Sequence, residues 1–156
     1  MKLATLCYVR RRGRTLMMHR VKMKNDLHAG KWNGLGGKFL PGESPEECVI
    51  REVREESGLK IAAPALKGFL SFPGFDGEDD WYVWVYEARR FTGRLRTSDE
   101  GELAWVPDPR VPRLPLWEGD RLFLKWMKGR RLFSGKLVYK KGRLKSHRVS
   151  FYPAAR

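Results

Sequence analysis

The pattern of apolar and polar residues along the chain predicts many strands and two helices. Short runs rich in valine and aromatic residues alternate with turn residues, which is typical of strands. Strands are predicted at residues 2–9, 15–20, 66–72, 81–90, 102–106, 131–139 and 143–151. The first two are joined by a turn at RRGR, and the last two form a hairpin around KKGR. Strands interrupted by helices indicate one α/β or α+β domain that spans residues 1–156.

The two helices are predicted from apolar residues spaced three and four positions apart. The first spans residues 45–57, where Ser44 and Glu47 form the S-x-x-E pattern of a helix start and Gly58 supplies the stop. The second spans residues 119–128. Its apolar stripe consists of Leu122, Phe123, Trp126 and Met127.

Composition excludes several classes of protein. The apolar share of 42% is ordinary for a globular domain, and no stretch approaches the ~18–20 apolar residues of a membrane span. The N-terminal run LATLCYV is followed by RRRGR, so it predicts a strand and not a signal peptide. Cys7 and Cys48 supply neither a disulfide framework nor metal-ligand spacing. We therefore expect a cytoplasmic monomer without a membrane partner.

The formal net charge of +14 is unevenly distributed. Residues 1–24 contain eight Lys or Arg and no acid, and residues 121–156 contain twelve and no acid. All eighteen acids lie between Asp26 and Asp120. Basic ends around an acidic middle suit a protein that attracts a polyanion and holds a cation at its centre. Solvated surface charge would give the same pattern.

The first predicted helix crowds Glu52, Glu55 and Glu56 onto adjacent positions at ~100° per residue. One explanation is a solvated face with pairs such as Arg51 and Glu55, each worth ~0.3–0.5 kcal/mol. However, like charges ~4 Å apart near a protein surface repel by on the order of 4 kcal/mol. A hard cation such as Mg²⁺ would reverse that repulsion. Helix geometry alone leaves both explanations open.

The loop before this helix, WNGLGGKFLPGE, is rich in glycine. Such a loop lets the backbone approach a phosphate or bind a cation through its carbonyl groups. Together with the helix it completes nine fixed positions, which are Gly37, Glu43, Arg51, Glu52, Val53, Glu55, Glu56, Gly58 and Leu59. This pattern resembles the Nudix box. The resemblance implies the Nudix fold, a mixed β-sheet between α-helices, and hydrolysis of a nucleoside diphosphate linked to a further group.

The resemblance also implies a metal site with Mg²⁺, or alternatively Mn²⁺. The ligands that it implies are Glu52, Glu56, the backbone carbonyl of Gly36, Glu55 and Glu100. Glu56, Glu52 and Glu100 are the candidates for orienting or deprotonating the attacking water, although Glu100 could equally belong to a solvated loop. Arg51 and Gly58 would have structural roles.

Beyond the box, the chain is similar to the mammalian-type oxidised-purine nucleoside triphosphatases of this family. The substrate-binding residues that this implies are Asn33, Gly37, Lys38, Trp117, Asp120, Trp81 and Leu27. Asn33 and Asp120 would bind the base edge, and Trp117 would stack on its ring. Without the resemblance, Trp117 and Trp81 are equally explained as packing residues, and Asp120 as an acid at a helix N-terminus.

Two positions depart from that mammalian type. Gly119 stands where it has the first of two adjacent acids, and Met23 stands where it has a lysine, which Lys22 or Lys24 could replace. A pocket that depends on two acids sharing one proton cannot work in the same way here. The sequence therefore supports the chemistry better than the choice of base.

We expect Mg²⁺-dependent hydrolysis of nucleoside triphosphates to a monophosphate and pyrophosphate, which removes oxidised purine nucleotides such as 8-oxo-dGTP. One alternative is a Nudix hydrolase of normal nucleotides, dinucleoside polyphosphates or RNA 5′ ends, to which the basic residues 121–156 would contribute. The other is a non-catalytic nucleic-acid-binding module. The nucleotide is thus the expected partner, and a nucleic acid is a partner only under these alternatives.

Overall fold

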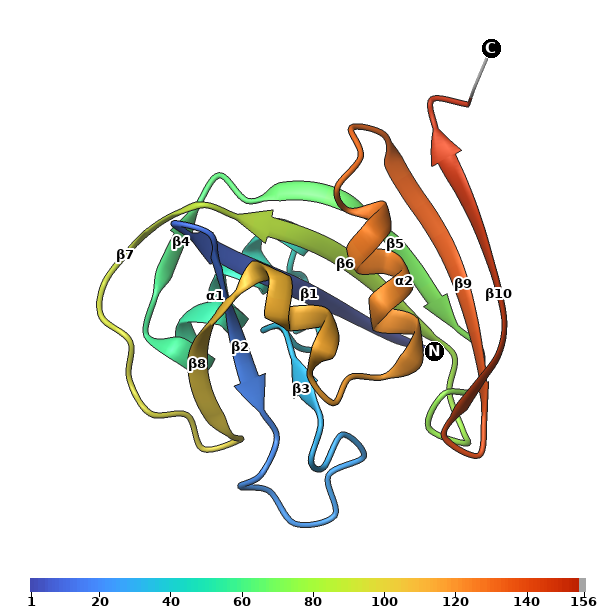
Figure 1. Cartoon of the computed structure of the whole chain (residues 1–156), viewed down its shortest axis with the longest axis horizontal. Coiled ribbons are helices and arrows are strands. Elements are labelled where there is room, and N and C mark those ends of the chain that lie inside the picture. Colours follow the sequence, from blue (N-terminus) through green and yellow to red (C-terminus); the bar gives the residue numbers. More distant parts are fainter. Residues whose placement is uncertain (155–156) are drawn as a thin grey trace.

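The computed structural model of the chain describes residues 1–154, and a mixed sheet of eight strands forms its centre (Figure 1). The strand order is β10-β9-β5-β6-β1-β2-β3, and β8 also pairs with β2. The bounds are β1 (Lys2–Arg11), β2 (Arg14–His19), β3 (Trp32–Asn33), β5 (Ala65–Phe72), β6 (Trp81–Ala88), β8 (Glu102–Pro107), β9 (Leu132–Lys140) and β10 (Arg143–Tyr152). A separate two-stranded sheet joins β4 (Lys60–Ala62) to β7 (Arg90–Thr92).

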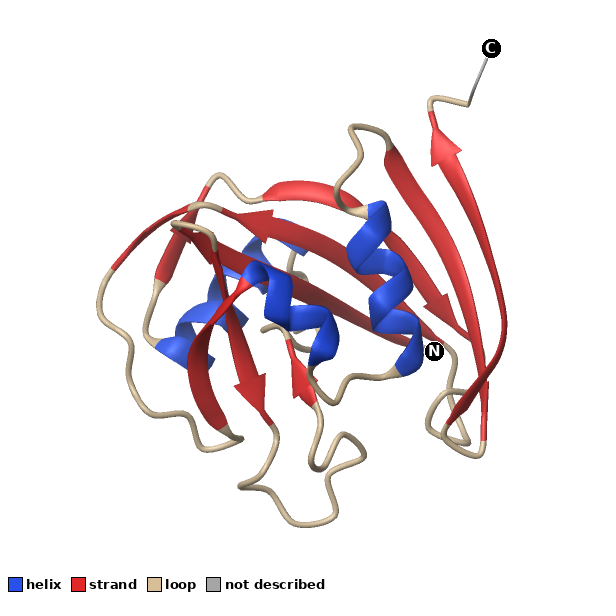
Figure 2. Cartoon of the chain, in the orientation of Figure 1, coloured by secondary structure: helices blue, strands red, loops and turns tan. Residues whose placement is uncertain are grey.

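Helices cover both faces of the large sheet (Figure 2). On one face, α2 (Glu118–Trp126) packs with the 3₁₀ helix η1 (Asp108–Arg113) over a buried cluster that includes Leu70, Val85 and Phe133. On the other face, α1 (Pro45–Ser57) packs over a second cluster that includes Cys7 and Tyr86. The expected mixed sheet between helices is therefore confirmed. No helix within the described residues is long and apolar enough to cross a membrane.

Two hairpin turns confirm the predictions made from RRGR and KKGR. Arg12 and Gly13 have φ angles of 50° and 75°, and Lys141 and Gly142 have φ angles of 51° and 77°. Two consecutive residues with positive φ are the signature of a tight turn that matches the twist of a hairpin, and glycine adopts this conformation without steric cost.

Helix α1 begins and ends where its sequence signals lie. The Ser44 side chain accepts a hydrogen bond from the Glu47 N–H at 3.1 Å, and the Glu47 side chain accepts one from the Ser44 N–H at 2.9 Å. Gly58 adopts φ 83° and donates its N–H to the Arg54 carbonyl. Val49 and Val53 are fully buried. The helix thus has a fixed start and a fixed inner face, which sets the direction of its glutamates.

Some predicted elements differ from the structure. The strand predicted at 81–90 ends at Ala88, because residues 90–92 leave the large sheet to pair with β4. The second helix begins at Glu118 and ends at Trp126, and its buried side includes Leu124, whereas Leu122 and Trp126 are only half-buried. Strands β3, β4 and β7 were not predicted, since two or three residues are too few to show periodicity, and η1 was not predicted because its segment DPRVPR contains two prolines.

Candidate active site

A cavity of about 520 Å³ is lined by residues from both halves of the sheet and from both helices. Ten of the residues proposed from the sequence line it, namely Leu27, Asn33, Gly36, Gly37, Lys38, Glu52, Trp81, Glu100, Trp117 and Asp120. The remaining proposed residues, Arg51, Glu55, Glu56 and Gly58, do not line it and belong to α1 and its C-terminal end. The cavity combines an acidic end at α1 with an aromatic end at α2.

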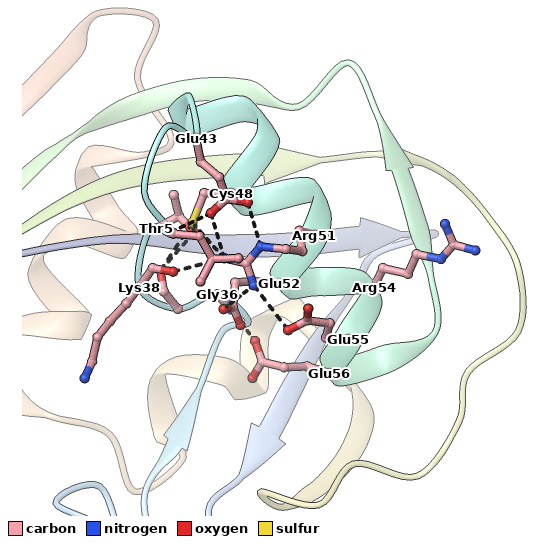
Figure 3. Close-up of polar contacts among 12 residues, drawn as sticks. Thr5, Gly36, Lys38, Glu43, Cys48, Arg51, Glu52, Arg54, Glu55 and Glu56 are labelled. Atoms are coloured by element: carbon pink, nitrogen blue, oxygen red, sulfur yellow. Dashed lines mark hydrogen bonds and ion pairs between the residues drawn. The ribbon is translucent and has the colours of Figure 1, made fainter.

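At the acidic end, the carboxylates of α1 lie around one arginine (Figure 3). Arg51 Nη1 donates to Glu52 Oε1 at 2.8 Å and to the exposed Glu55 Oε2 at 3.2 Å. Its Nε and Nη2 donate to the two oxygens of Glu43 at 2.6 and 2.8 Å. This supports the structural role that was proposed for Arg51, because its guanidinium fixes the loop before α1 to the helix.

Exchanging Arg51 for methionine is expected to lower the free energy of unfolding near neutral pH. The Arg51 hydrogen bonds, with a smaller contribution from the Leu40 N–H, lower the pKa of Glu43 from 4.5 to about 2. A lowered carboxyl pKa stabilises the fold above the unfolded value and ceases to do so as the pH falls through the folded value. The difference in unfolding free energy between wild type and Arg51→Met should therefore shrink as the pH falls from 4.5 to about 2. Urea unfolding at several pH values measures this difference.

Arg54→Met is the matched control for this experiment. Arg54 lies on the same helix, points away from the carboxylates in Figure 3 and forms no ion pair among residues 1–154. An equal loss of stability in both variants, or a loss in Arg51→Met that does not depend on pH, would contradict the role given to the ion pair with Glu43.

Glu56 is the most deeply buried acid of α1, with only 6% of its surface exposed. Its Oε1 accepts the Gly36 N–H at 2.7 Å. Burial raises the pKa of Glu56 well above its usual value, and the neighbouring carboxyls of Glu100 and Glu52 raise it further. Burial also raises the pKa of Glu52, although Arg51 opposes that shift. A buried carboxyl surrounded by acids is a strong base once it is ionised, and it attracts cations.

The donor set fits a hard divalent cation by its chemistry. Glu52, Glu56 and Glu100 supply carboxylate oxygens, and the Gly36 carbonyl accepts no backbone hydrogen bond from residues 1–154, whereas its neighbour Gly37 accepts from Thr5. As the side chains stand, with Glu52 turned to Arg51, no three acid, histidine or cysteine side chains in the described chain are arranged as a ligand set. Arg51 binds only Oε1 of Glu52, so the other oxygen, Oε2, has no hydrogen-bond partner within residues 1–154.

Two glycines allow the loop before α1 to lie close to the Glu52 carboxyl and to strand β1. A Cβ atom on Gly37 would lie 2.5 Å from the carboxyl carbon of Glu52, and one on Gly36 would lie 2.0 Å from the Thr5 carbonyl oxygen. Gly36 also has φ 145°. A side chain at position 36 would collide with the β1 backbone at Thr5, and one at position 37 would displace the Glu52 carboxyl, so these glycines set how closely the loop lies to β1 and to that carboxyl.

At the aromatic end, Trp117 lies in a cage of rings. Its ring centroid is 5.0 Å from that of Phe75 and 5.4 Å from that of Tyr139, both edge to face, and its Nε1 donates to His28 Nδ1 at 2.8 Å. Lys31 Nζ lies 5.0 Å from the ring centroid. Trp117 is 9% exposed, so it both packs in the core and lines the cavity. The two explanations given for it from the sequence are therefore compatible.

Two polar groups at this end lack partners. The Asn33 Oδ1 atom is buried and accepts no hydrogen bond in the described structure. Asp120 is 7% exposed, and its carboxyl forms no hydrogen bond with a side chain or the backbone of residues 1–154. Burial raises the pKa of Asp120 to about 8, against the opposing effect of Arg121 and Lys31. Buried polar groups are normally satisfied, so these two point to a ligand.

Tyr139 occupies the space beside Asp120 that a side chain at position 119 would need. Its hydroxyl accepts the Gly119 N–H at 2.7 Å, and a Cβ atom on Gly119 would lie 2.7 Å from that hydroxyl oxygen. Tyr139 also lines the cavity. Gly119, where the mammalian type has an acid, is therefore matched by Tyr139 of β9, which fills the space of the missing side chain. The sequence pattern did not reveal this match because the two residues meet only in the folded chain.

The other proposed residues lie at the rim. Lys38 is exposed, and its Nζ lies 5.7 Å from the Trp81 ring centroid. The Trp81 Nε1–H donates a hydrogen bond to the Asp76 carboxylate at 2.9 Å. Leu27 is 50% exposed. Lys22 donates to the Ser98 carbonyl and does not line the cavity. Residues that the sequence reasoning did not name include Arg20, which bridges Asp26 at 2.8 Å and Glu100 at 3.3 Å. The only sequence signal for Arg20 is the mixture of basic and acidic residues in the segment from Arg20 to Asp26.

Comparisons with known proteins agree with this geometry. The model of the NUDIX domain family matches residues 1–127. An uncharacterized Nudix hydrolase of Bacillus subtilis is 38% identical over 70% of this chain and 73% of its own length. The oxidized purine nucleoside triphosphate hydrolase of Danio rerio is 35% identical over 86% of this chain and 84% of its own. The crystal structure of a MutT protein from Bacillus halodurans has a TM-score of 0.86 and 30% identity, covering 96% of this chain and 98% of that one.

Proposed function

This chain belongs to the Nudix family of hydrolases, and from that premise we propose that it hydrolyses nucleoside triphosphates to a monophosphate and pyrophosphate, with oxidised purine nucleotides such as 8-oxo-dGTP as substrates. One observation carries the proposal. A single cavity joins the carboxylates of Glu52 and Glu100 to two unpaired polar groups, Asn33 and Asp120, beside an aromatic cage. We further propose that the chain acts as a single-domain monomer in the cytoplasm.

Nudix hydrolases generally use divalent metal ions, and we infer Mg²⁺ for this chain. Glu52, Glu56, the Gly36 carbonyl and Glu100 would hold it, while Glu55 would join them only on leaving Arg51. When bound, the ion neutralises phosphate oxygens and lowers the pKa of a water molecule. Mn²⁺ is the alternative with the same preference for oxygen ligands.

Side chains of the protein would supply the proton transfer, the phosphate contact and the shielding from water. A Glu56 oxygen takes the proton of the attacking water, since burial makes that carboxyl more basic than an exposed glutamate. Lys38, at the rim of the cavity, pairs with a phosphate oxygen and steadies the charge that develops on the leaving pyrophosphate. Trp81 and Leu27 shield the mouth of the cavity from water.

The base would be recognised at the other end of the cavity. Asn33 Oδ1 offers an acceptor, and Asp120, whose pKa is about 8, is largely protonated near neutral pH and can both donate and accept. One neutral acid therefore replaces the pair of acids of the mammalian type. Trp117 presents a ring against which a purine can pack.

The test is a turnover panel with Mg²⁺ that compares kcat/KM for 8-oxo-dGTP, 2-hydroxy-dATP and the normal triphosphates and identifies the product. We expect a preference of at least about tenfold for an oxidised purine, because one correctly paired buried hydrogen bond is worth about 1.4 kcal/mol, and we expect pyrophosphate as product. Equal turnover of all triphosphates would overturn the proposed base specificity and redirect the search to dinucleoside polyphosphates and RNA ends. No turnover of any nucleotide would overturn the whole proposal.

A further inference from the structure

Helix α1 leaves part of its own face of the sheet uncovered. It packs on β1 and β4, and the buried cluster beneath it includes no residue of β9 or β10. Beyond β6, that face consequently carries exposed side chains. Those classed as exposed on this face of β5, β6, β9 and β10 include Phe69, Tyr82, Ser134, Lys136, Arg148 and Ser150, together with Ser146 and Tyr152 of β10.

The pairing register arranges this face into two rows. Tyr82 pairs with Ser71, Ser71 with Lys136, and Lys136 with Arg148. The second row lies two positions away on each strand, and therefore on the same face. It consists of Trp84, Phe69, Ser134 and Ser150. We call these eight residues the platform. Adjacent strands lie ~4.8 Å apart, so each row extends over ~14 Å.

One half of the platform is aromatic. The rings of Phe69 and Trp84 meet edge to face with centroids 5.8 Å apart, and Tyr82 is 40% exposed. These three residues also line a shallow apolar cavity of about 240 Å³, whose other walls include Met1 and Leu3. Exposed aromatic rings on a flat sheet offer surfaces on which planar groups can stack.

The other half is cationic and not neutralised. Lys136 and Arg148 face each other across β9 and β10, and neither forms an ion pair with an acid among residues 1–154. No acid occurs in residues 121–156. Lys136 and Arg148 therefore remain available to an anionic partner.

We propose that the platform binds a short run of single-stranded nucleic acid. Bases stack on Tyr82 and Phe69, and phosphates pair with Lys136 and Arg148 one or two strands away. A single strand is required because duplex bases are already stacked on one another and are not free to lie on aromatic rings. None of the eight residues lines the active-site cavity, so this binding is separate from hydrolysis of a nucleotide.

Chemistry favours this partner over two others. Ser71, Ser134 and Ser150 lie among the rings and cations, and hydroxyl groups suit sugars and phosphates better than lipid acyl chains. A twofold pairing of this face centred on Lys136 and Arg148 would bring these cations close to their own equivalents, where like charges repel. Anionic lipid surfaces and self-association therefore become outcomes of the test.

The test measures fluorescence anisotropy of labelled oligo(dT) of about 12 nucleotides, a length within the range that one sheet surface covers, with the full chain at several salt concentrations. For Lys136→Ser/Arg148→Ser we expect the slope of log affinity against log salt to become shallower by about 1.4, since each phosphate contact to a single strand contributes about 0.7. For Tyr82→Ser we expect affinity to fall about tenfold with the slope unchanged. Turnover of nucleoside triphosphates should stay at the wild-type value in both variants.

Lys60→Ser/Arg110→Ser is the matched control, because both residues are exposed, lie away from the platform and remove the same charge. An equal loss of affinity in this control, or full affinity in Tyr82→Ser, would show that the oligonucleotide binds by non-specific charge attraction, and it would overturn the proposal. It would also be overturned if the platform variants lost binding to phosphatidylserine vesicles without any change toward oligo(dT). A dimer in solution that the platform variants separate would overturn it as well.

Discussion

Replacing Glu56 with glutamine is expected to lower kcat by on the order of 10³-fold while the protein stays folded. Removing a general base typically costs 10²–10⁴-fold, and here the same carboxyl would also be lost as an oxygen ligand. The glutamine carbonyl can still accept the Gly36 N–H, and glutamine has nearly the same shape as the buried glutamate, so the fold should be retained. Steady-state kinetics with pyrophosphate detection measures the loss, and circular dichroism with thermal unfolding checks the fold.

Glu102→Gln is the control for this variant. Glu102 is exposed on β8 and undergoes the same chemical change, so its turnover should match the wild type. A Glu56→Gln enzyme that keeps more than about a tenth of its activity would show that another group, with Glu52 and Glu100 as the next candidates, takes the proton.

Replacing Asp120 with asparagine is expected to lower kcat/KM for the preferred oxidised purine by about 10–10²-fold, mainly through KM. A buried hydrogen bond that is lost or mispaired costs about 1–3 kcal/mol. The wild type should also lose kcat/KM as the pH rises through about 8, because Asp120 then releases the proton that it donates. Asparagine is neutral at every pH, so the variant should lack this fall.

The same substrate must be used for both proteins, so that any titration of the nucleotide itself cancels in the ratio. Asp99→Asn, which alters an exposed acid in the loop before β8, should leave both kcat/KM and its pH profile unchanged. An unchanged profile in Asp120→Asn, or a loss that is equal for normal and oxidised purines, would remove Asp120 from base recognition.

The acidic end of the site could be predicted because its signals are local. The cap at Ser44, the stop at Gly58 and the direction of Glu52 and Glu56 all follow from one helix and one loop. Nine positions within 23 residues thus contain most of the information about the catalytic side. The resemblance supplied the proposed roles, and the structure places Glu52 and Glu100 in the lining of the cavity and the Glu56 carboxyl against the Gly36 N–H.

The aromatic end could not be predicted to the same degree, because it depends on the strand order. Tyr139 reaches the cavity only because β9 pairs in parallel with β5, an arrangement that no local pattern encodes. His28 and Phe75 lie in loops without periodicity, and their contacts with Trp117 depend on the fold as a whole. The same applies to the platform, whose rows exist only in the pairing register.

The contact between Gly119 and Tyr139 restricts how this pocket can change during evolution. An acid introduced at position 119 would collide with the tyrosine hydroxyl, and a phenylalanine at 139 would leave the Gly119 N–H without its acceptor. Each single substitution therefore gives a less stable protein, and even the double substitution leaves the N–H of residue 119 without that acceptor and its Cβ atom 2.8 Å from Leu137 Cδ1. An acid at position 119 therefore requires compensating changes at both 137 and 139, so these three positions should vary together among related sequences.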